Sequence, residues 1–199
     1  MRCFKKLFKK KDVNISISIP EEEALKPDSV REDGIYPAEF KHGSFIFEEI
    51  VKGAKTGNFH PAYINSEYAH QELRSQIADS IYSKECGSVN GGMMTSKIIV
   101  IYLGGEVSGF CWSTSPLENT FEIYMLSVRK GSRKAGLGKL LLLDTLASYP
   151  KGSKAIARIY KDAFKTDRNK SMQKMLIKEG FSRSVKQHIR TTQFNKKIS

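Results

Sequence analysis

The sequence has few of the residues that build disulfide frameworks or metal centres. Its three cysteines, Cys3, Cys86 and Cys111, lie far apart and form no C-x-x-C pair. This spacing favours neither a disulfide scaffold nor a cysteine-rich metal site. The four histidines show no metal-ligand spacing either, so no metal site is expected. Scattered, reduced cysteines are typical of intracellular proteins, and we expect a cytoplasmic one.

Long apolar stretches are also missing. No run approaches the ~20 apolar residues of a membrane span, and the N-terminus lacks the apolar segment of a signal peptide. Residues 1–11 are basic, with Phe4, Leu7 and Phe8 at helical spacing. This pattern is compatible with weak contact to an anionic membrane, aided by a lipid on Cys3. A solvated tail is the reading that we favour.

Charge is very unevenly distributed along the 199 residues, which carry a formal net charge of +12. Residues 1–33 sum to +1, residues 34–128 to −4 and residues 129–199 to +15. Such a division suits an enzyme that brings a cationic amine to a polyanionic cofactor. A solvated basic face is the alternative. Nucleic-acid binding is disfavoured, because aromatic residues are not interleaved with the basic ones.

The chain divides at about Gly34. Residues 20–33 hold Glu21-Glu22-Glu23 and two prolines, a composition that buries little apolar surface and is typical of a linker. We therefore predict a basic, then acidic, N-terminal tail over residues 1–33 and one folded domain over residues 34–199, which is long enough for its own core.

Hydrophobic periodicity predicts an α/β (α+β) domain. A strand at 35–41 precedes a helix capped by Ser44 and a second helix that begins at Asn65 or Ser66. Further strands are expected at 98–103, 106–113, 121–128, 155–160, 181–185 and 189–194, with helices around 140–147 and 169–179. The helix around 140–147 is rich in leucine and has few polar positions, so we expect it to be mostly buried. The order β-α-α-β-β-β-α-β-α-β-β indicates a mixed, mostly antiparallel central sheet flanked by helices.

A glycine-containing loop, Arg133–Gly138, lies between a predicted strand and a predicted helix. It is not an ATP-binding P-loop, because position 137 is Leu where that motif needs Lys. A dinucleotide fingerprint would need a third glycine at Leu141. Backbone N–H groups at a helix N-terminus, freed of side chains by Gly136 and Gly138, can bind a diphosphate. Positive charge around the loop comes from Arg129, Lys130, Arg133, Lys134 and Lys139.

Three motifs in order resemble the GNAT superfamily of N-acetyltransferases. They are the strand Glu122–Val128, then Arg133-x-x-Gly136-x-Gly138, then Asn169 followed by Gly180-Phe181. The resemblance covers roughly residues 34–196 and extends to the order of the elements. It implies a GNAT-like fold and an acetyl-CoA-dependent N-acetyltransferase, with acetyl-CoA as cosubstrate and no metal.

The same resemblance implies a cofactor site made largely of backbone. The diphosphate would rest on the amides of Arg133, Lys134, Ala135, Gly136, Leu137, Gly138 and Lys139. Pantetheine would pair with the backbone of Leu126, Ser127 and Val128, and Asn169 would contact the CoA. A strand that diverges from its neighbour exposes the N–H and C=O groups that such pairing needs.

Acetyl transfer to an amine needs a base, because an alkyl amine of pKa ~10.4 is almost wholly protonated at neutral pH. Glu122 lies 14 residues before Gly136 and resembles in its spacing the general-base glutamate of the family's histone-acetylating branch. We expect it on the same strand face as Tyr124, Leu126 and Val128. The alternative is that Glu122 lies on a solvated face of the strand.

The resemblance is incomplete at Leu176, where many relatives have a tyrosine that protonates the leaving thiolate. Tyr160, Tyr124 or a water could donate that proton instead, and a thiol of pKa ~8.5 also leaves acceptably as a thiolate. The acceptor, whether a protein amine, a polyamine or a small amine, stays open. Two alternative functions also stay open: CoA binding without catalysis, and nucleic-acid binding through the basic C-terminal half.

Overall fold

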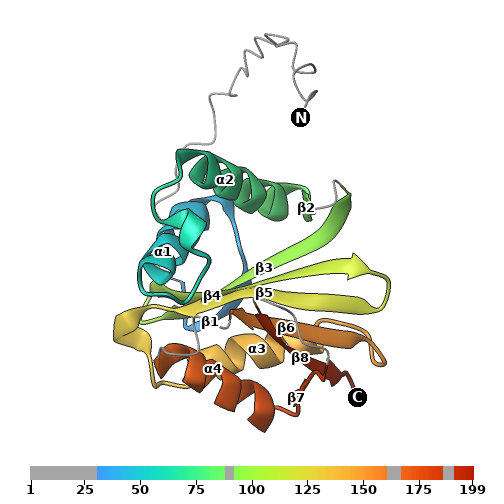
Figure 1. Ribbon diagram of the computed structural model, residues 1–199. Coiled ribbons are helices and arrows are strands. Elements are labelled where there is room, and N and C mark those ends of the chain that lie inside the picture. Colours follow the sequence, from blue (N-terminus) through green and yellow to red (C-terminus); the bar gives the residue numbers. More distant parts are fainter. Residues whose placement is uncertain (1–30, 88–91, 161–166, 186–190) are drawn as a thin grey trace, which may run out of the picture.

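The computed structural model describes residues 31–87, 92–160, 167–185 and 191–199. The basic pattern of Met1–Lys11, Cys3, most of the predicted linker at 20–33 and one of the four histidines, His188, lie outside these ranges. In chain order the elements are β1 (Gly34–Pro37), α1 (Gly43–Lys55), α2 (Glu67–Tyr82), β2 (Glu85–Gly87), β3 (Met93–Leu103), β4 (Glu106–Leu117), β5 (Thr120–Val128), α3 (Leu137–Ala147), β6 (Lys154–Tyr160), α4 (Asp167–Lys178), β7 (Ser182–Arg183) and β8 (Thr191–Lys197). Figure 1 shows their arrangement.

The described strands form one mixed sheet in the order β1-β3-β4-β5-β6-β8-β7, with β2 paired to β3. All neighbouring strands run antiparallel except β5 and β6, which are parallel. The predicted α/β fold class is therefore confirmed. The short β2 was missed. Several strand bounds also differ from the prediction: β1 ends at Pro37 rather than at 41, β3 begins at Met93 rather than at 98, and β7 covers only Ser182–Arg183 rather than 181–185.

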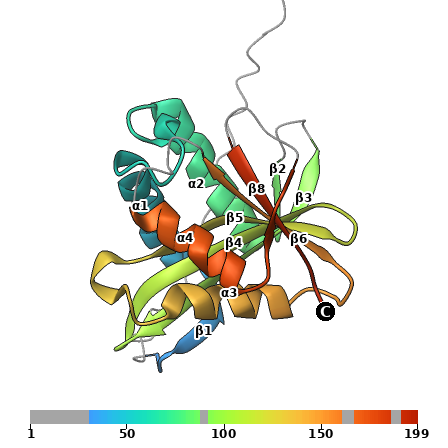
Figure 2. The same ribbon diagram turned by 60° about the horizontal axis from the view of Figure 1, so that its bottom comes forward.

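Helices cover both faces of the sheet, which gives two cores (Figures 1 and 2). On one face α1 and α2 pack against β3 and β4 through Ile50, Leu73 and Trp112, all fully buried. On the other face α3 and α4 pack against the sheet through Leu141 and Leu176. The two faces are separated by the pleat of the strands, so neighbouring residues of one strand serve different cores.

The prediction that α3 is mostly buried was wrong. Leu140 is 49% exposed and Leu143 37% exposed, although Leu141, Leu142 and Leu146 are buried in the core. Only one stripe of the helix can face a sheet, and no further layer covers the opposite side of α3 among the described residues. Apolar composition therefore overestimated its burial.

The start of α1 also differs from the prediction. Ser44 was expected to cap this helix, but the helix begins at Gly43 and its N-cap residue is His42. A short 3₁₀ turn, Phe40–His42, leads directly into the helix, and His42 already has helical φ and ψ of −83° and −12°. Because the chain is helical before it reaches Ser44, that hydroxyl lies inside the helix.

The C-terminus of α4 is a Schellman motif at Gly180-Phe181. Gly180 has a φ of +83°, and its N–H donates to the Ile177 carbonyl at 3.0 Å, while Phe181 N–H donates to the Leu176 carbonyl at 2.9 Å. Leu176 and Phe181 are both buried, which supplies the hydrophobic contact of the motif. This turn fixes the end of α4 against the sheet.

A β-bulge in β5 changes which face its residues occupy. Met125 lies opposite Trp112 of β4, yet Ile123 lies opposite Ser113, so Tyr124 is an extra residue in β5. A bulge of this kind shifts the alternation of side chains by one residue. Phe121 and Ile123 belong to the α3 core, whereas Met125 belongs to the α1–α2 core.

Close packing against the backbone of β5 makes Gly109 of β4 a position where a larger residue should lower stability. A Cβ atom there would lie 2.8 Å from the Ser127 carbonyl oxygen and 3.2 Å from Leu141 Cδ1. We expect Gly109→Ala to lower the free energy of unfolding by about 1–3 kcal/mol, as measured by urea denaturation. Gly131→Ala is the control, because nothing lies within 4 Å of its Cβ position. Equal effects of the two substitutions would contradict the argument.

Candidate functional site

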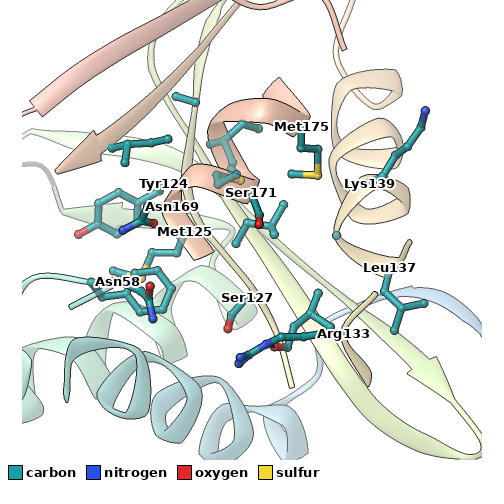
Figure 3. A pocket seen from close by; sticks show the side chains of 18 of the residues that line it. Asn58, Tyr124, Met125, Ser127, Arg133, Leu137, Lys139, Asn169, Ser171 and Met175 are labelled. Carbon is teal, nitrogen blue, oxygen red and sulfur yellow. Dashed lines mark hydrogen bonds between the residues drawn. The ribbon is translucent and has the colours of Figure 1, made fainter. Parts of the chain in front are cut away.

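A cavity opens where β5 and β6 stop pairing. The parallel register runs from Thr120–Lys154 to Ile123–Ala157, and beyond this point the two strands border a cavity of about 640 Å³. Its walls come from β5, β6, α4, the loop before α3 and the segment between α1 and α2. Figure 3 shows side chains from these elements around it. This volume is typical of a site for a cofactor or small molecule.

The loop before α3 has the backbone geometry of an anion site. Lys134 and Gly136 both have left-handed φ angles, +72° and +79°. Gly136 is the N-cap of α3 without a side-chain cap, and its carbonyl accepts from the N–H groups of Lys139 and Leu140. The preceding N–H groups of the first turn lie before these intrahelical bonds and can serve a ligand. This arrangement suits a diphosphate.

Side chains and backbone groups hold this loop against the start of β4 and the end of β5. Arg133 Nε donates to the Val128 carbonyl at 3.0 Å, and Ser132 Oγ donates to Ser108 Oγ at 3.0 Å. Arg129 donates from its backbone N–H to the Ser108 carbonyl at 2.8 Å. The loop is therefore positioned by the strands that border the cavity.

Lys139 has a carboxylate partner, which the sequence did not indicate. Its Nζ lies 2.8 Å from Oε1 of Glu179, at the end of α4. Glu179 is largely buried, whereas Lys139 is 55% exposed. In Figure 3 the Lys139 side chain points away from Ser127 and Arg133. Part of the positive charge expected around the loop is thus neutralised by an ion pair that joins α3 to α4.

The structure brings almost all of the sequence-predicted cofactor residues to this one cavity. Leu126, Ser127, Val128, Arg133, Lys134, Gly136, Leu137, Gly138, Lys139 and Asn169 all line it. Ala135 does not line it and is exposed. Asn169 is 7% exposed and lies in the first turns of α4. Segments 126–128, 133–139 and 169, distant in sequence, therefore meet at one site.

Glu122 lies beside this cavity but not in its lining. Its carboxylate forms an ion pair with Arg158 of β6, whose side chain does line the cavity. The expectation that Glu122 shares a face with Leu126 and Val128 was wrong. Those two residues pack against the α3 core, whereas the bulge at Tyr124 leaves Glu122 on the opposite face.

Leu176 has no proton to donate, and it also lies away from the cavity. It is fully buried in the α3 core and does not line the cavity. Other α4 side chains do, namely Ser171, Met172 and Met175. Of the alternative donors, Tyr124 lines the cavity, and its ring packs edge-on to Trp112 at 5.2 Å. The side chain of Tyr160 lies outside the described part of the chain.

Neither described cysteine has the character of a nucleophile. Burial raises the pKa of the Cys111 thiol to about 12, and burial also raises the pKa of Cys86. Both thiols are free and buried. A thiol attacks as its thiolate, and so high a pKa leaves almost none at neutral pH. The described residues thus offer no cysteine for a covalent acyl-enzyme.

Several cavity residues were missed at the level of the sequence. Arg158, Met172 and Met175 all line the cavity. The sequence could have indicated Arg158, because it is the charged residue of an otherwise apolar strand, Ala155–Tyr160. Its neighbours Ala157 and Ile159 are buried. The methionines of α4 resemble ordinary core residues, and periodicity alone could not assign them to a cavity.

The described residues hold neither a metal-ligand cluster nor a membrane-spanning helix. No group of three or more His, Cys, Asp or Glu side chains is placed to hold a metal ion within residues 31–87, 92–160, 167–185 and 191–199. In the same ranges, no helix has the length and apolar character that crossing a membrane requires.

Comparison with solved structures identifies the architecture. A PaiA N-acetyltransferase of Thermoplasma acidophilum in complex with coenzyme A aligns with a TM-score of 0.59 and 16% identity, over 84% of this chain and 99% of that chain. A GNAT-family acetyltransferase of Streptococcus pneumoniae gives 0.59 and 14%, over 84% and 100%. The ribosomal-protein-S18-alanine N-acetyltransferase of Escherichia coli gives 0.56 and 12%, over 84% and 95%.

These similarities establish the fold. The chain has the GNAT N-acetyltransferase fold, with the cavity at the divergence of its central parallel strands. No protein-family model matches the sequence, and no curated protein matches it. At such low sequence identity, the shared fold says nothing by itself about activity.

Gly136, the N-cap residue of α3, has a left-handed φ, so its substitution should lower stability because of backbone strain alone. Gly136→Ala places a Cβ at a φ of +79°, which costs about 1–2 kcal/mol for an L-residue. We expect this loss in the free energy of unfolding. At Gly138 the nearest atoms to a Cβ are 3.7 Å away, so Gly138→Ala should change stability by less than about 0.5 kcal/mol. Differential scanning calorimetry of both variants tests this, and the reverse order would refute it.

Proposed function

We propose that this protein is an N-acetyltransferase that moves the acetyl group of acetyl-CoA to a primary amine within a ternary complex. The observation that carries the proposal is the cavity at the divergence of β5 and β6, bordered at one side by the glycine loop of α3. A neighbour of the same fold is described as a complex with coenzyme A. Fold, loop geometry and cavity thus favour the same ligand.

The proposed cofactor site follows from these features. The first-turn amides at Leu137 and Gly138 would bind the diphosphate, with Arg133 and Lys134 adding positive charge. Pantetheine would lie along the stretch of β5 at 126–128 that has left β6, pairing with backbone groups as an added strand does. Asn169 at the α4 side of the cavity would contact the same arm.

The chemistry is direct attack. One proton of the acceptor ammonium passes to the Glu122 carboxylate, directly or through a water, and the lone pair that this frees attacks the thioester carbonyl carbon. The C–S bond of the tetrahedral intermediate then breaks to release CoA thiolate, and the amide nitrogen loses its second proton to water. A backbone N–H near Val128 would stabilise the oxyanion. Neither described cysteine lines the cavity, which favours this route over a cysteine acyl-enzyme. Tyr124 or a water would protonate the thiolate.

CoA binding is tested with Gly138→Ala. The added Cβ would lie 3.7 Å from Leu126 Cδ2 and Val128 Cγ2 and 3.8 Å from Met175 Sδ, all of them side chains of the cavity. It would narrow the space where we expect the cofactor, so CoA affinity should fall at least about tenfold. Isothermal titration calorimetry measures it. Gly131→Ala should bind CoA like the parent protein, and unchanged affinity of Gly138→Ala would exclude this cofactor position.

The base is tested with Glu122→Gln. We expect kcat to fall about 100-fold or more, with CoA affinity nearly unchanged because Glu122 does not line the cavity. Release of CoA thiol from acetyl-CoA in the presence of an amine panel is the assay. Glu118→Gln is the matched control, since Glu118 lies in the exposed turn between β4 and β5. Normal turnover of Glu122→Gln would remove this residue from the mechanism.

The same assay separates the proposal from a relative that binds CoA without catalysis. Tight CoA binding with no thiol release for any amine would favour that alternative. The acceptor amine belongs to a small molecule or to a protein. The similar protein from Escherichia coli is named for acetylation of a ribosomal protein alanine.

A further inference from the structure

One charge at the cavity is not explained by a CoA ligand. The cationic side chains that line it are Arg133, Lys134, Lys139 and Arg158, and its described lining contains no Asp or Glu. The first three surround the α3 loop, where a diphosphate would lie. Arg158 belongs to β6 and is the first residue beyond the last β5–β6 pair, Ile123–Ala157.

Arg158 also faces away from the loop and its helix. Ala157 and Ile159 on either side of it belong to the α3 core, so Arg158 projects from the opposite face of the sheet. That is the face on which Phe59 and Tyr63, between α1 and α2, contribute to the cavity lining and pack against the α1–α2 core. The cation therefore lies on the side of the sheet away from the loop where the diphosphate would lie, which leaves it available to the acceptor.

The guanidinium of Arg158 has capacity for a second anion. Its side chain is 36% exposed, and among the described residues its only polar contact runs from Nη1 to Glu122 Oε2. Arginine has five N–H donors in a planar fork. The remaining donors are free to bind a carboxylate in the geometry that guanidinium groups prefer.

The pair of Arg158 and Glu122 presents adjacent positive and negative charges. We infer that the acceptor of the proposed reaction is a small zwitterion, an amino acid whose carboxylate binds Arg158 while its amine approaches Glu122. This inference rests on the proposed function and adds the substrate class to it. The carboxylate of the acceptor would bind the remaining N–H donors of Arg158, and its ammonium group would bind the Glu122 carboxylate, so the acceptor would form two ion pairs with the protein.

The apolar surroundings of Arg158 strengthen its ion pair with a carboxylate. Phe59, Tyr63 and Met125 give the acceptor side an apolar wall. A charged group next to such a wall is costly to leave without a partner and interacts strongly with one. A polyamine would bring only positive charge to this cation, so Arg158 disfavours it.

The test compares amino acids with their own carboxamides. Glycine, leucine, methionine and phenylalanine are each assayed as the free acid and as the carboxamide, by thiol release from acetyl-CoA and by calorimetry on the CoA-loaded protein. The parent protein should prefer the acids in kcat/KM. In Arg158→Gln that preference should fall by about 10- to 100-fold, mainly through KM. Arg158→Lys should restore part of it.

Arg183→Gln is the control, because Arg183 is an exposed arginine of β7 outside the cavity. CoA binding by each variant verifies that it is folded. Equal handling of acids and carboxamides by the parent protein, or a uniform loss for both in Arg158→Gln, would overturn the inference and leave Arg158 as a residue that positions Glu122. Acid-selective binding without any thiol release would instead overturn the proposed function and retain the carboxylate site.

Discussion

The loss of pairing between β5 and β6 after Ile123 and Ala157 is the constraint on which the rest of the structure depends. A parallel sheet normally keeps its backbone groups bonded across the strands. Here two central strands separate, and a cavity of about 640 Å³ occupies the opening. The helices and the glycine loop that border the cavity are positioned by these strands, so the site exists because the sheet is incomplete at its centre.

The bulge at Tyr124 acts at the same point. It offsets β5 by one residue, so that Ile123 packs toward α3 while Met125 packs toward α1 and α2. As a result, side chains of β5 pack into both cores, and residues of the same strand also line the cavity. Bulges commonly re-aim side chains next to functional sites, and this one decides that Glu122 meets Arg158 rather than the residues of the α3 face.

The cations that line the cavity lie in two places, at the loop before α3 and at Arg158 of β6. The described lining carries four cations without an acid, yet Lys139 is held by Glu179 and Arg158 by Glu122. These two ion pairs limit the repulsion among like charges in a confined space. Arg133 and Lys134 also line the cavity near the N-terminus of α3. There the helix dipole stabilises a bound anion as well.

Local signals in the sequence determined most of the fold and the glycine loop before α3. The Gly104-Gly105 hairpin, Gly180 at the end of α4 and Gly136 before α3 all have the left-handed φ angles that a glycine favours, so short segments specify them. Only the tertiary structure decided the face of Glu122, its ion pair with Arg158, the burial of Leu176 and the exposure of Leu140. Each of these depends on register or on a packing partner distant in the chain, which local periodicity does not contain.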